Sequence, residues 1–582
     1  YFQSVVATAP IAEKQLPVKL FLETFESLAG RMEGPASPVI ERARVGIKSY
    51  ASRLSATVSM LSGVARPVPK IMHFVWVGGS EVGNIQRDYM NIWRALLGPE
   101  DYRFNLWYDS DALLAFEMNR VILDSARAHA MESGGDQVSK PSQLSQMIED
   151  RARILKLQMS DYINQPQWAG RRDDARIQLM VSAYGKDRTV LEAFRQKCLD
   201  SHLAMASDDL HLRDVGHEFA GHFLQDVYQR EVGMRGNFAA ASDVVRLQAG
   251  FLEGGRYSDM DYLPPFADGL GGVDISKFSA DAKVGVLQLL LNEDAALMPG
   301  RDRSRYTDRT DKIPAEHKDK LLAFAREKPG LSRIFVAPKD RSVPQDAVRL
   351  GVARGIASNN EMNAHFLAHP RSAMTMAYMQ AIRLNYDCLY EVERRLDAAG
   401  IVATDDSRVI SVIQNVVNEK QAEGRFPGSK NHYSSASLIE AIATYYQDGI
   451  RIGARGTITL TGPGGAVAGV AKYIEDKLLP DHVDDVRNHL KLVSGYNVYT
   501  EEEMISGWTV NDDPEQWLTK EHNKWKDGKL LSRYGANLTE LLNEHHMTFK
   551  QGWPVIEGKP VFLTDVLQKL MNDLGEPLIN AM

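Results

Sequence analysis

The chain has 582 residues, of which 44% are hydrophobic and 25% are charged, and its formal net charge is −8 at pH 7. This composition is typical of a folded protein, and the length predicts one elaborated domain or two to three lobes. The negative charge argues against nucleic acid as the main partner. The two cysteines, Cys198 and Cys388, lie far apart in the sequence, which excludes a cysteine-based zinc site and a disulfide framework.

Two amphipathic helices are predicted near the start of the chain. Apolar residues recur at helical spacing over 17–29, Gly34-Pro35 breaks the pattern, and a second apolar stripe runs from Ile40 to Leu61. The pattern fits either an ordinary packed hairpin with solvated charges or a module over residues 5–68 that contacts an anionic membrane. The basic residues around the second helix are Arg42, Arg44, Lys48, Arg53 and Arg66.

An α/β pattern follows Pro67-Val-Pro69, and we expect one domain over 69–582 with helical insertions at about 132–235 and 372–450. Residues 132–235 are polar, charged and helix-periodic, which is typical of an insertion rather than of part of a sheet. Gly453–Gly465 predicts a strand, a turn and a helix start. The other predicted strands are 71–77, 103–108 and Ile334–Ala337, and the helices are 111–131, 286–297, 315–328 and 372–397, with α/β character again over 238–263.

The most informative motif is Asp259-Met-Asp261. A predicted amphipathic helix runs into Gly254-Gly255, and the short strand Arg256-Tyr257-Ser258 then delivers two acids separated by one residue. On an extended chain these two carboxylates share a face. Hard oxygen ligands held in this way suit Mg²⁺ or Mn²⁺ bound together with a diphosphate. Two acids in a turn also occur as a solvated loop or as a helix cap.

Residues near this motif favour the site interpretation. Asp243 and Arg246 lie three apart, on one face of the preceding helix, and can reach the same place as the acids. Trp76 belongs to the strand-like run Ile71–Val77, which Gly78-Gly79 closes. An aromatic ring beside a glycine turn at a strand end is either a seat for a nucleobase or a core tryptophan.

Several blocks of the sequence resemble the catalytic domain of the large clostridial glucosylating toxins. The blocks occur in the family order across nearly the whole chain, and the intervening segments match by length and helical character. They are Ile71–Gly79, Trp107–Leu114, Ala240–Pro264, Ile458–Pro463 and Glu502–Trp508. The resemblance implies a GT-A fold, which is a Rossmann-like α/β core with helical insertions and an N-terminal helical bundle that associates with membrane.

The resemblance also implies an activity. It is retaining transfer of a sugar from a UDP-sugar to a side-chain hydroxyl of a host protein, usually a Rho- or Ras-type small GTPase, with Mn²⁺ favoured over Mg²⁺. It implies an enzyme that a bacterium secretes and that acts in the host cytosol at the inner face of the membrane. Two other interpretations stay open, which are a non-catalytic membrane-seated adaptor and a transferase with a carbohydrate acceptor.

Residue roles follow from the matched blocks. The resemblance implies that Trp76 stacks on uracil with Ser242 nearby, Asp243 holds sugar hydroxyls, and Arg246 contacts sugar and phosphate. Tyr257 then flanks the diphosphate, Asp259 contacts ribose and, through water, the metal, and Asp261 ligates the metal. Residues of a C-terminal loop complete the site, and Asn359 lies near the sugar. In the C-terminal loop, the resemblance implies that Glu503 and Ser506 complete the metal site and that Trp508 donates to the leaving oxygen of the diphosphate.

Two departures bear on specificity. Ser358 and Asn360 occupy positions that influence sugar choice in the family, and their small size slightly favours UDP-N-acetylglucosamine over UDP-glucose, since one methylene shifts such choices by about 1–3 kcal/mol. Gly453 and Gly464 replace two acids that engage the GTPase, whereas Arg455 keeps a basic position. The target is then another GTPase or a different protein, unless these changes are drift at a tolerant surface.

Overall fold

A computed structural model describes most of the middle of the chain. The described ranges are 66–134, 141–276, 278–300, 308–336, 342–354, 359–401, 406–423, 435–447 and 454–477, with three short strands between 548 and 560. Both helices expected before residue 66 lie outside the described residues, and so do Ser358, Glu503, Ser506 and Trp508.

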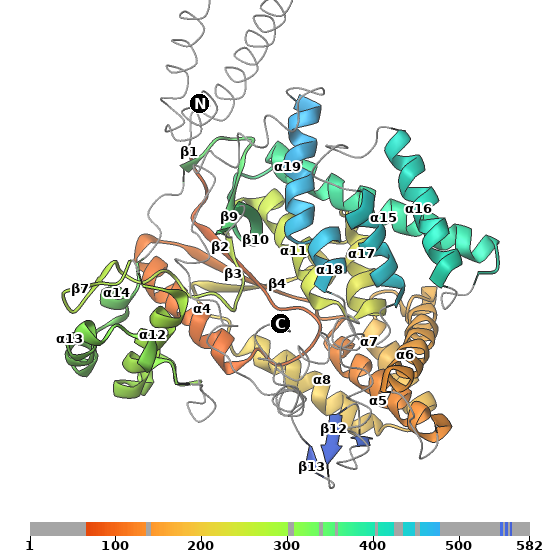
Figure 1. Ribbon diagram of the computed structural model, residues 1–582, viewed down its shortest axis with the longest axis horizontal. Helices are drawn as coiled ribbons and strands as arrows, with labels where there is room; N and C mark the ends of the chain where they lie inside the picture. The colour runs from red at the N-terminus through yellow and green to blue at the C-terminus, as the bar shows by residue number, and fades with distance from the viewer. Residues whose placement is uncertain are drawn as a thin grey trace, which may run out of the picture.

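The centre of the fold is a six-stranded sheet with the strand order β4-β3-β2-β5-β10-β9 (Figure 1). The first four strands in this order run parallel, whereas β10 runs antiparallel to both β5 and β9. The bounds are β2 (Ile71–Val75), β3 (Arg103–Tyr108), β4 (Leu210–Asp214), β5 (Gly255–Ser258), β9 (Val348–Arg354) and β10 (Asn359–Ala368). The predicted strands at 71–77 and 103–108 and the short strand before Asp259 are therefore confirmed.

Side chains of the sheet alternate between two hydrophobic cores, as the pleat requires. Met72 and Phe74 pack with Trp93 of α4 (Asn84–Leu97) on one face. Val75 belongs instead to the core on the opposite face, with residues of α11 (Phe238–Glu253). The two faces together bury the parallel strands, which is why the runs at 71–77 and 103–108 are so apolar.

A helical group at the lower right in Figure 1 has its own core. It consists of α5 (Ala115–Gly134), α6 (Pro141–Ile163), α7 (Arg172–Tyr184) and α8 (Arg188–Leu203). This confirms the helical character predicted for most of 132–235. The prediction that the segment stays out of the sheet is wrong, because Leu210–Asp214 forms the edge strand β4 beside β3. Five residues of polar alternation give too short a signal within a helix-periodic segment.

A second helical group packs on the α11 side of the sheet, at the upper right in Figure 1. Its helices are α15 (Ala373–Ala398), α16 (Asp406–Ala422), α17 (Ser435–Gln447), α18 (Ala454–Leu460) and α19 (Pro463–Lys477). The helix predicted over 372–397 is confirmed. The strand predicted within Gly453–Gly465 is wrong, because this stretch forms α18 and the start of α19. Its β-branched residues favour a strand locally, but tertiary packing overrides that preference.

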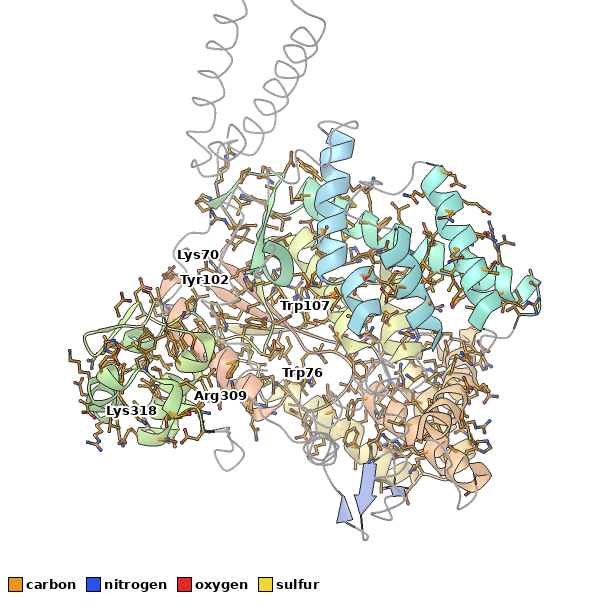
Figure 2. All side chains as sticks on the ribbon, in the orientation of Figure 1. Lys70, Trp76, Tyr102, Trp107, Arg309 and Lys318 are labelled. Atoms are coloured by element: carbon orange, nitrogen blue, oxygen red, sulfur yellow. The ribbon has the colours of Figure 1, made fainter. Side chains whose placement is uncertain are left out.

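A third group, at the left in Figure 1, has a separate core. It contains α12 (Ala280–Glu293), α13 (Ala315–Arg326) and α14 (Leu331–Ile334), and Figure 2 labels Arg309 and Lys318 in it. The helix predicted over 315–328 is confirmed, whereas the strand predicted over Ile334–Ala337 is wrong. Ile334 ends α14, and Phe335 forms only an isolated bridge with Phe266, whose ring it stacks on at 5.4 Å.

No helix within the described ranges is both long and apolar enough to cross a membrane.

The remaining elements are short. The short helices are α9 (Val215–Glu218), α10 (Gln225–Gln229), a π-helix η4 (Arg230–Arg235), and the 3₁₀ helices at 98–100, 166–168, 295–297 and 310–312. The short strands are β1 (Arg66–Pro67), β6 (Gly269–Leu270), β7 (Val273–Asp274), β8 (Ser342–Val343), β11 (Thr548–Lys550), β12 (Trp553–Ile556) and β13 (Lys559–Pro560).

Candidate functional site

The predicted site residues gather where two neighbouring parallel strands end. β2 pairs with β5 so that His73 lies opposite Tyr257, and Trp76 and Asp259 follow the last residues of these strands. In open α/β sheets ligands bind beyond the carboxyl ends of the strands. The fold therefore places Trp76 and Asp259 at the edge where a ligand is expected.

Two glycines make the turn from α11 into β5. Gly254 and Gly255 have φ values of +67° and +98°, and a Cβ at Gly255 would lie 2.5 Å from the carbonyl oxygen of Ile71. Larger residues would strain the backbone and hold β5 away from β2. The Gly254 carbonyl accepts a hydrogen bond of 2.8 Å from His73 Nε2, while His73 Nδ1 accepts one of 3.0 Å from Trp107 Nε1. This buried pair of contacts fixes the end of α11 on the sheet.

Asp259 lies at the centre of the site. Its carboxylate forms an ion pair of 2.9 Å with Arg246 Nη2, and the Tyr257 hydroxyl donates to the same oxygen. The Arg246 guanidinium lies over the Tyr257 ring, 4.5 Å from its centroid. The Asp259 side chain keeps 27% of its surface exposed, against 6% for Arg246. Solvent can therefore reach the carboxylate while the charge that pairs with it stays buried.

Arg246 has several further acceptors. Nη1 donates to the backbone oxygen of Asn363 at 2.8 Å, and Nη2 donates to Ser242 Oγ at 3.1 Å. Burial alone would lower the pKa of Arg246, but the charges of Asp259 and Asp243 raise its pKa above the ordinary value. The arginine therefore stays a fixed positive charge at the strand ends.

Asp243 is buried beside Arg246. Its Oδ1 accepts from Asn363 Nδ2 at 2.7 Å, its Oδ2 accepts from Thr461 Oγ1 at 2.7 Å, and Arg246 Nη2 lies 3.3 Å away. Burial raises the pKa of the Asp243 carboxyl to about 6, although Arg246 and the two neutral donors oppose that shift. Both oxygens are thus held in place, as a group that must bind in one orientation requires.

Asp261 sits in a turn rather than on a strand. β5 ends at Ser258, and the amide of Tyr262 bonds the carbonyl of Asp259 at 3.3 Å. The argument that an extended chain aligns the two carboxylates is therefore wrong, although both residues do follow the same strand end. In the part of the chain that the structure describes, no group of three or more His, Cys, Asp or Glu could hold a metal.

Trp76 lies near the middle of the molecule in Figure 2. Its side chain is half-buried and packs against the core that contains Met72 and Phe74, and its Nε1 donates to the Ser80 carbonyl at 3.0 Å. The side chain therefore contacts the core and keeps part of its surface exposed, at a position just after β2. The two interpretations of this tryptophan, core residue and base platform, are compatible.

Two residues of the site were missed by sequence reasoning. Asn363 lies on β10, a strand that was not predicted, and Thr461 follows α18. Asn359 and Asn360 start the same β10 and pair with Arg354 and Ala353. Thr461 did lie within a block that carried the resemblance, so its position could have been flagged, but nothing local ties it to Asp243.

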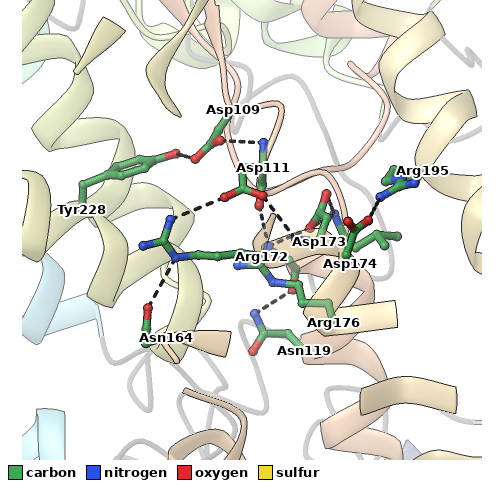
Figure 3. Close-up of polar contacts among 12 residues, drawn as sticks. Asp109, Asp111, Asn119, Asn164, Arg172, Asp173, Asp174, Arg176, Arg195 and Tyr228 are labelled. Atoms are coloured by element: carbon green, nitrogen blue, oxygen red, sulfur yellow. Dashed lines mark hydrogen bonds and ion pairs between the residues drawn. The ribbon is translucent and has the colours of Figure 1, made fainter. Parts of the chain in front are cut away.

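A second polar cluster lies after β3 (Figure 3). Asp173 Oδ1 accepts from Arg176 Nη1 at 2.7 Å, and its two oxygens also cap the amide of Leu114. Asp109 accepts from the Tyr228 hydroxyl at 2.8 Å and from the amide of Asp111 at 2.9 Å. Burial raises the pKa of Asp109 to about 6. These contacts tie the loop at 109–114 to α7 and α10.

The grouping at the strand ends has a clear chemical capacity. A buried arginine, a partly exposed carboxylate and an aromatic ring just after the adjacent strand suit a ligand with an anionic centre and a flat ring. The sheet and this grouping define a mixed α/β domain with a polar candidate site at its strand ends.

Comparison with known proteins identifies the family. The model of the TcdA/TcdB catalytic glycosyltransferase domain matches residues 70–460. The chain belongs to this family, which confirms the resemblance found in the sequence.

The curated relatives are much longer than this chain. Cytotoxin-L of Paraclostridium sordellii is 23% identical over 477 residues, and Toxin B of Clostridioides difficile is 23% identical over 474 residues. Each match covers 79% of this chain and 19% of the relative. The chain therefore spans about a fifth of the length of these proteins.

Solved structures share the fold. The catalytic domain of alpha-toxin from Clostridium novyi gives a TM-score of 0.62 at 18% identity and covers 89% of this chain and 94% of its own. The UDP-bound glycosyltransferase domain of the YGT toxin gives a TM-score of 0.51 at 18% identity, over 71% of this chain and 77% of its own. The mixed α/β fold with a central sheet is that of toxin glycosyltransferase domains.

Proposed function

We propose that this chain transfers a sugar from a UDP-sugar to a side-chain hydroxyl of a host protein, with retention, on a GT-A fold. The observation that carries the proposal is the Arg246–Asp259 pair at the end of β5, with Trp76 at the end of the adjacent β2. The family to which the chain belongs supports the glycosyltransferase class. The UDP in the related YGT domain supports the choice of nucleotide.

The donor would lie across the two strand ends. The exposed part of Trp76 would stack on uracil, and Ser242 lies on the helix that also carries Asp243 and Arg246. Arg246 would meet the negative charge that builds on the diphosphate as the anomeric bond breaks, because its guanidinium is already buried and fixed. Asp243 would accept hydrogen bonds from sugar hydroxyls, and Tyr257 would hold Asp259 in place beside the diphosphate.

The described residues would supply only some of the ligands that a divalent cation needs at this site. Asp259 and Asp261 supply hard oxygen ligands after β5, as Mn²⁺ or Mg²⁺ requires. Glu503 and Ser506 would complete the ligand set, and Trp508 would donate to the leaving oxygen. When bound, the cation neutralises charge on the diphosphate. Arg246 pairs with Asp259 and holds that carboxylate in one orientation.

The acceptor and the sugar are proposed from the family pattern. The acceptor would be a small GTPase of the Rho or Ras type near an anionic membrane surface, in the cytosol of a host cell that a secreted bacterial protein has entered. Ser358 and Asn360, with Asn359 near the sugar, slightly favour N-acetylglucosamine over glucose. The N-terminal bundle over 5–68 would provide the membrane contact.

Donor hydrolysis tests this function directly. Purified protein is mixed with UDP-glucose or UDP-N-acetylglucosamine, with and without Mn²⁺, and the release of UDP is measured. We expect metal-dependent turnover of one donor and a loss of about 10²–10³-fold in Asp261→Asn.

The control for the donor hydrolysis is a variant outside the proposed site. Asp311→Asn, an exposed acid of the third helical group, should leave turnover unchanged. Neither turnover nor binding of either donor by the unmodified chain would contradict the proposal and favour the adaptor interpretation. Turnover that is equal with and without metal would contradict the cation role alone.

A further inference from the structure

We propose that Thr461 is a positioning residue, which holds Asp243 in the orientation that receives the sugar. The inference rests on the proposed function of Asp243 as the group that accepts hydrogen bonds from the donor sugar. Thr461 is fully buried, and its hydroxyl lies 2.7 Å from Asp243 Oδ2. It is separated from Asp243 by 218 residues in the sequence, so the contact exists only in the folded chain.

The direction of this hydrogen bond follows from the donors and acceptors present. A threonine hydroxyl carries one hydrogen, and its two nearby acceptors are Asp243 Oδ2 at 2.7 Å and the Thr457 carbonyl at 3.3 Å. The shorter contact, to a carboxylate, is the stronger one. Thr461 therefore donates to Asp243, while Asn363 Nδ2 donates to the other oxygen.

The backbone of Thr461 is itself anchored. The buried hydroxyl of Tyr378, on α15, lies 2.7 Å from the Thr461 carbonyl and 2.8 Å from the Gly462 carbonyl. The amide of Thr461 donates to the Thr457 carbonyl at 3.2 Å. The hydroxyl that meets Asp243 therefore projects from a rigid junction between α18 and α19.

Thr457, four residues before Thr461, contacts the start of α11, the helix that carries Asp243. Asn237 caps α11 by accepting from the amide of Ala240, and its Nδ2 donates to Thr457 Oγ1 at 2.9 Å. Thr457 and Thr461 are four residues apart and so share one face of the α18 turn, whereas Ile458 is 47% exposed. The two threonines thus fix α18 against the part of α11 that carries Ser242 and Asp243.

The nucleotide and the sugar of the donor would therefore depend on different residues of the site. UDP would contact Trp76, Arg246 and Asp259, and among the described residues no printed hydrogen bond joins any of these three to Thr461. The sugar alone would depend on Asp243. Removal of the Thr461 hydroxyl should then weaken the binding of a UDP-sugar and leave the binding of UDP intact.

The experiment compares these ligands by calorimetry on the full chain. Thr461→Val keeps the shape of the side chain and removes the donor. We expect the affinity for the preferred donor, among UDP-glucose and UDP-N-acetylglucosamine, to fall about tenfold or more, while the affinity for UDP changes less than about twofold. Thr461→Ser should restore the affinity for the UDP-sugar, because it restores the hydroxyl.

The matched control is Thr375→Val. Thr375 is also buried, on α15, and its hydroxyl has no hydrogen-bond partner among the described residues. This substitution should change neither affinity. Two results would overturn the positioning role. In one, the Thr461→Val variant binds the UDP-sugar as tightly as the unmodified chain does. In the other, its affinities for UDP and for the UDP-sugar fall by the same factor.

A second measurement needs no ligand. A double-mutant cycle of Thr461→Val and Asp243→Ala, followed by thermal unfolding, should give effects that are not additive, since the two side chains share one hydrogen bond. Additive effects would overturn the inference. If the unmodified chain binds UDP but no UDP-sugar, the proposed function fails, while the cycle still decides whether Thr461 holds Asp243.

Discussion

Two pairs of buried side chains among the described residues share a sequence signature, an aspartate followed three residues later by an arginine on a helix. In Asp173–Arg176 the two side chains meet at 2.7 Å and are 4% and 0% exposed. In Asp243–Arg246 they lie 3.3 Å apart and are both 6% exposed. The first pair, which we call closed, bonds otherwise to the backbone of one loop, since Asp173 accepts from the amide of Leu114 and Arg176 Nη1 donates to the carbonyl of Asp111. The second is open, because Arg246 lies closer to a second carboxylate, that of Asp259, at 2.9 Å.

The difference shows what separates a structural ion pair from a candidate site. Burial and charge are nearly the same in both pairs. What differs is that the arginine of the second pair reaches a carboxylate that is 27% exposed at the end of a strand. The closed pair fastens a loop to a helix, whereas we propose that the open pair presents its charge to a ligand. Each prediction below tests one side of this contrast.

The largest expected effect is on the closed pair. Arg176→Met leaves the buried Asp173 charge without its partner, which should lower the free energy of unfolding by about 3–5 kcal/mol. Urea unfolding followed by circular dichroism measures this. The control is Arg188→Met, whose exposed pair with Glu192 should contribute less than about 1 kcal/mol. Equal midpoints for both variants would contradict the structural role.

The next effect is on the open pair. Arg246→Gln removes the fixed positive charge at the strand ends, so we expect turnover of the UDP-sugar to fall about 10²–10³-fold. Donor hydrolysis at saturating substrate measures the loss. The Arg188→Met variant should keep its turnover and serves as the control again. Full activity in Arg246→Gln would remove the contrast between the two pairs.

A third prediction concerns pH and Asp109, beside the closed pair. Burial raises its pKa to about 6 in the folded chain, from 3.8. The stability that it contributes is therefore present below pH 3.8 and is lost as the pH rises through 6. Relative to Asp109→Asn, the unmodified chain should lose about 3 kcal/mol between pH 4 and 7. Parallel unfolding curves for the two proteins over this range would contradict the raised pKa.

The smallest effect is expected at Trp76. Trp76→Leu keeps apolar contact with the core but removes the indole surface beyond β2. UDP affinity should fall about tenfold, since the stacking of a base on an aromatic ring contributes about 1–3 kcal/mol. Calorimetry with UDP measures the change. Trp168→Leu, in the first helical group, is the control, and unchanged UDP affinity in Trp76→Leu would make that residue purely a core tryptophan.

The sequence predicted the part of the fold with strong local signals. The apolar runs of β2 and β3, and the helix that ends at Gly254-Gly255 before β5, follow from patterns within a few residues. β9 and β10 were not predicted, because Asn359–Ala368 mixes polar and apolar residues and this strand depends on pairing with β5. α18 was misassigned because Thr457, Ile458 and Thr459 favour a strand until packing decides.

The candidate site divides in the same way. Asp243, Arg246 and Asp259 were predicted because helical spacing and a strand end bring them together locally. Asn363 and Thr461 were missed because they reach Asp243 from 120 and 218 residues away. No periodicity or motif carries that information. Asp173 and Arg176 show the converse, since their spacing alone would have suggested a site where the structure has a fastened loop.

The position of bound UDP tests the central claim most directly. A crystal structure of the chain with UDP and Mn²⁺ should place the uracil against Trp76 and the diphosphate within hydrogen-bond distance of Arg246, with the Asp173–Arg176 pair unchanged. A nucleotide bound elsewhere, with Arg246 still closed on Asp259, would contradict the assignment of the open pair as the donor site.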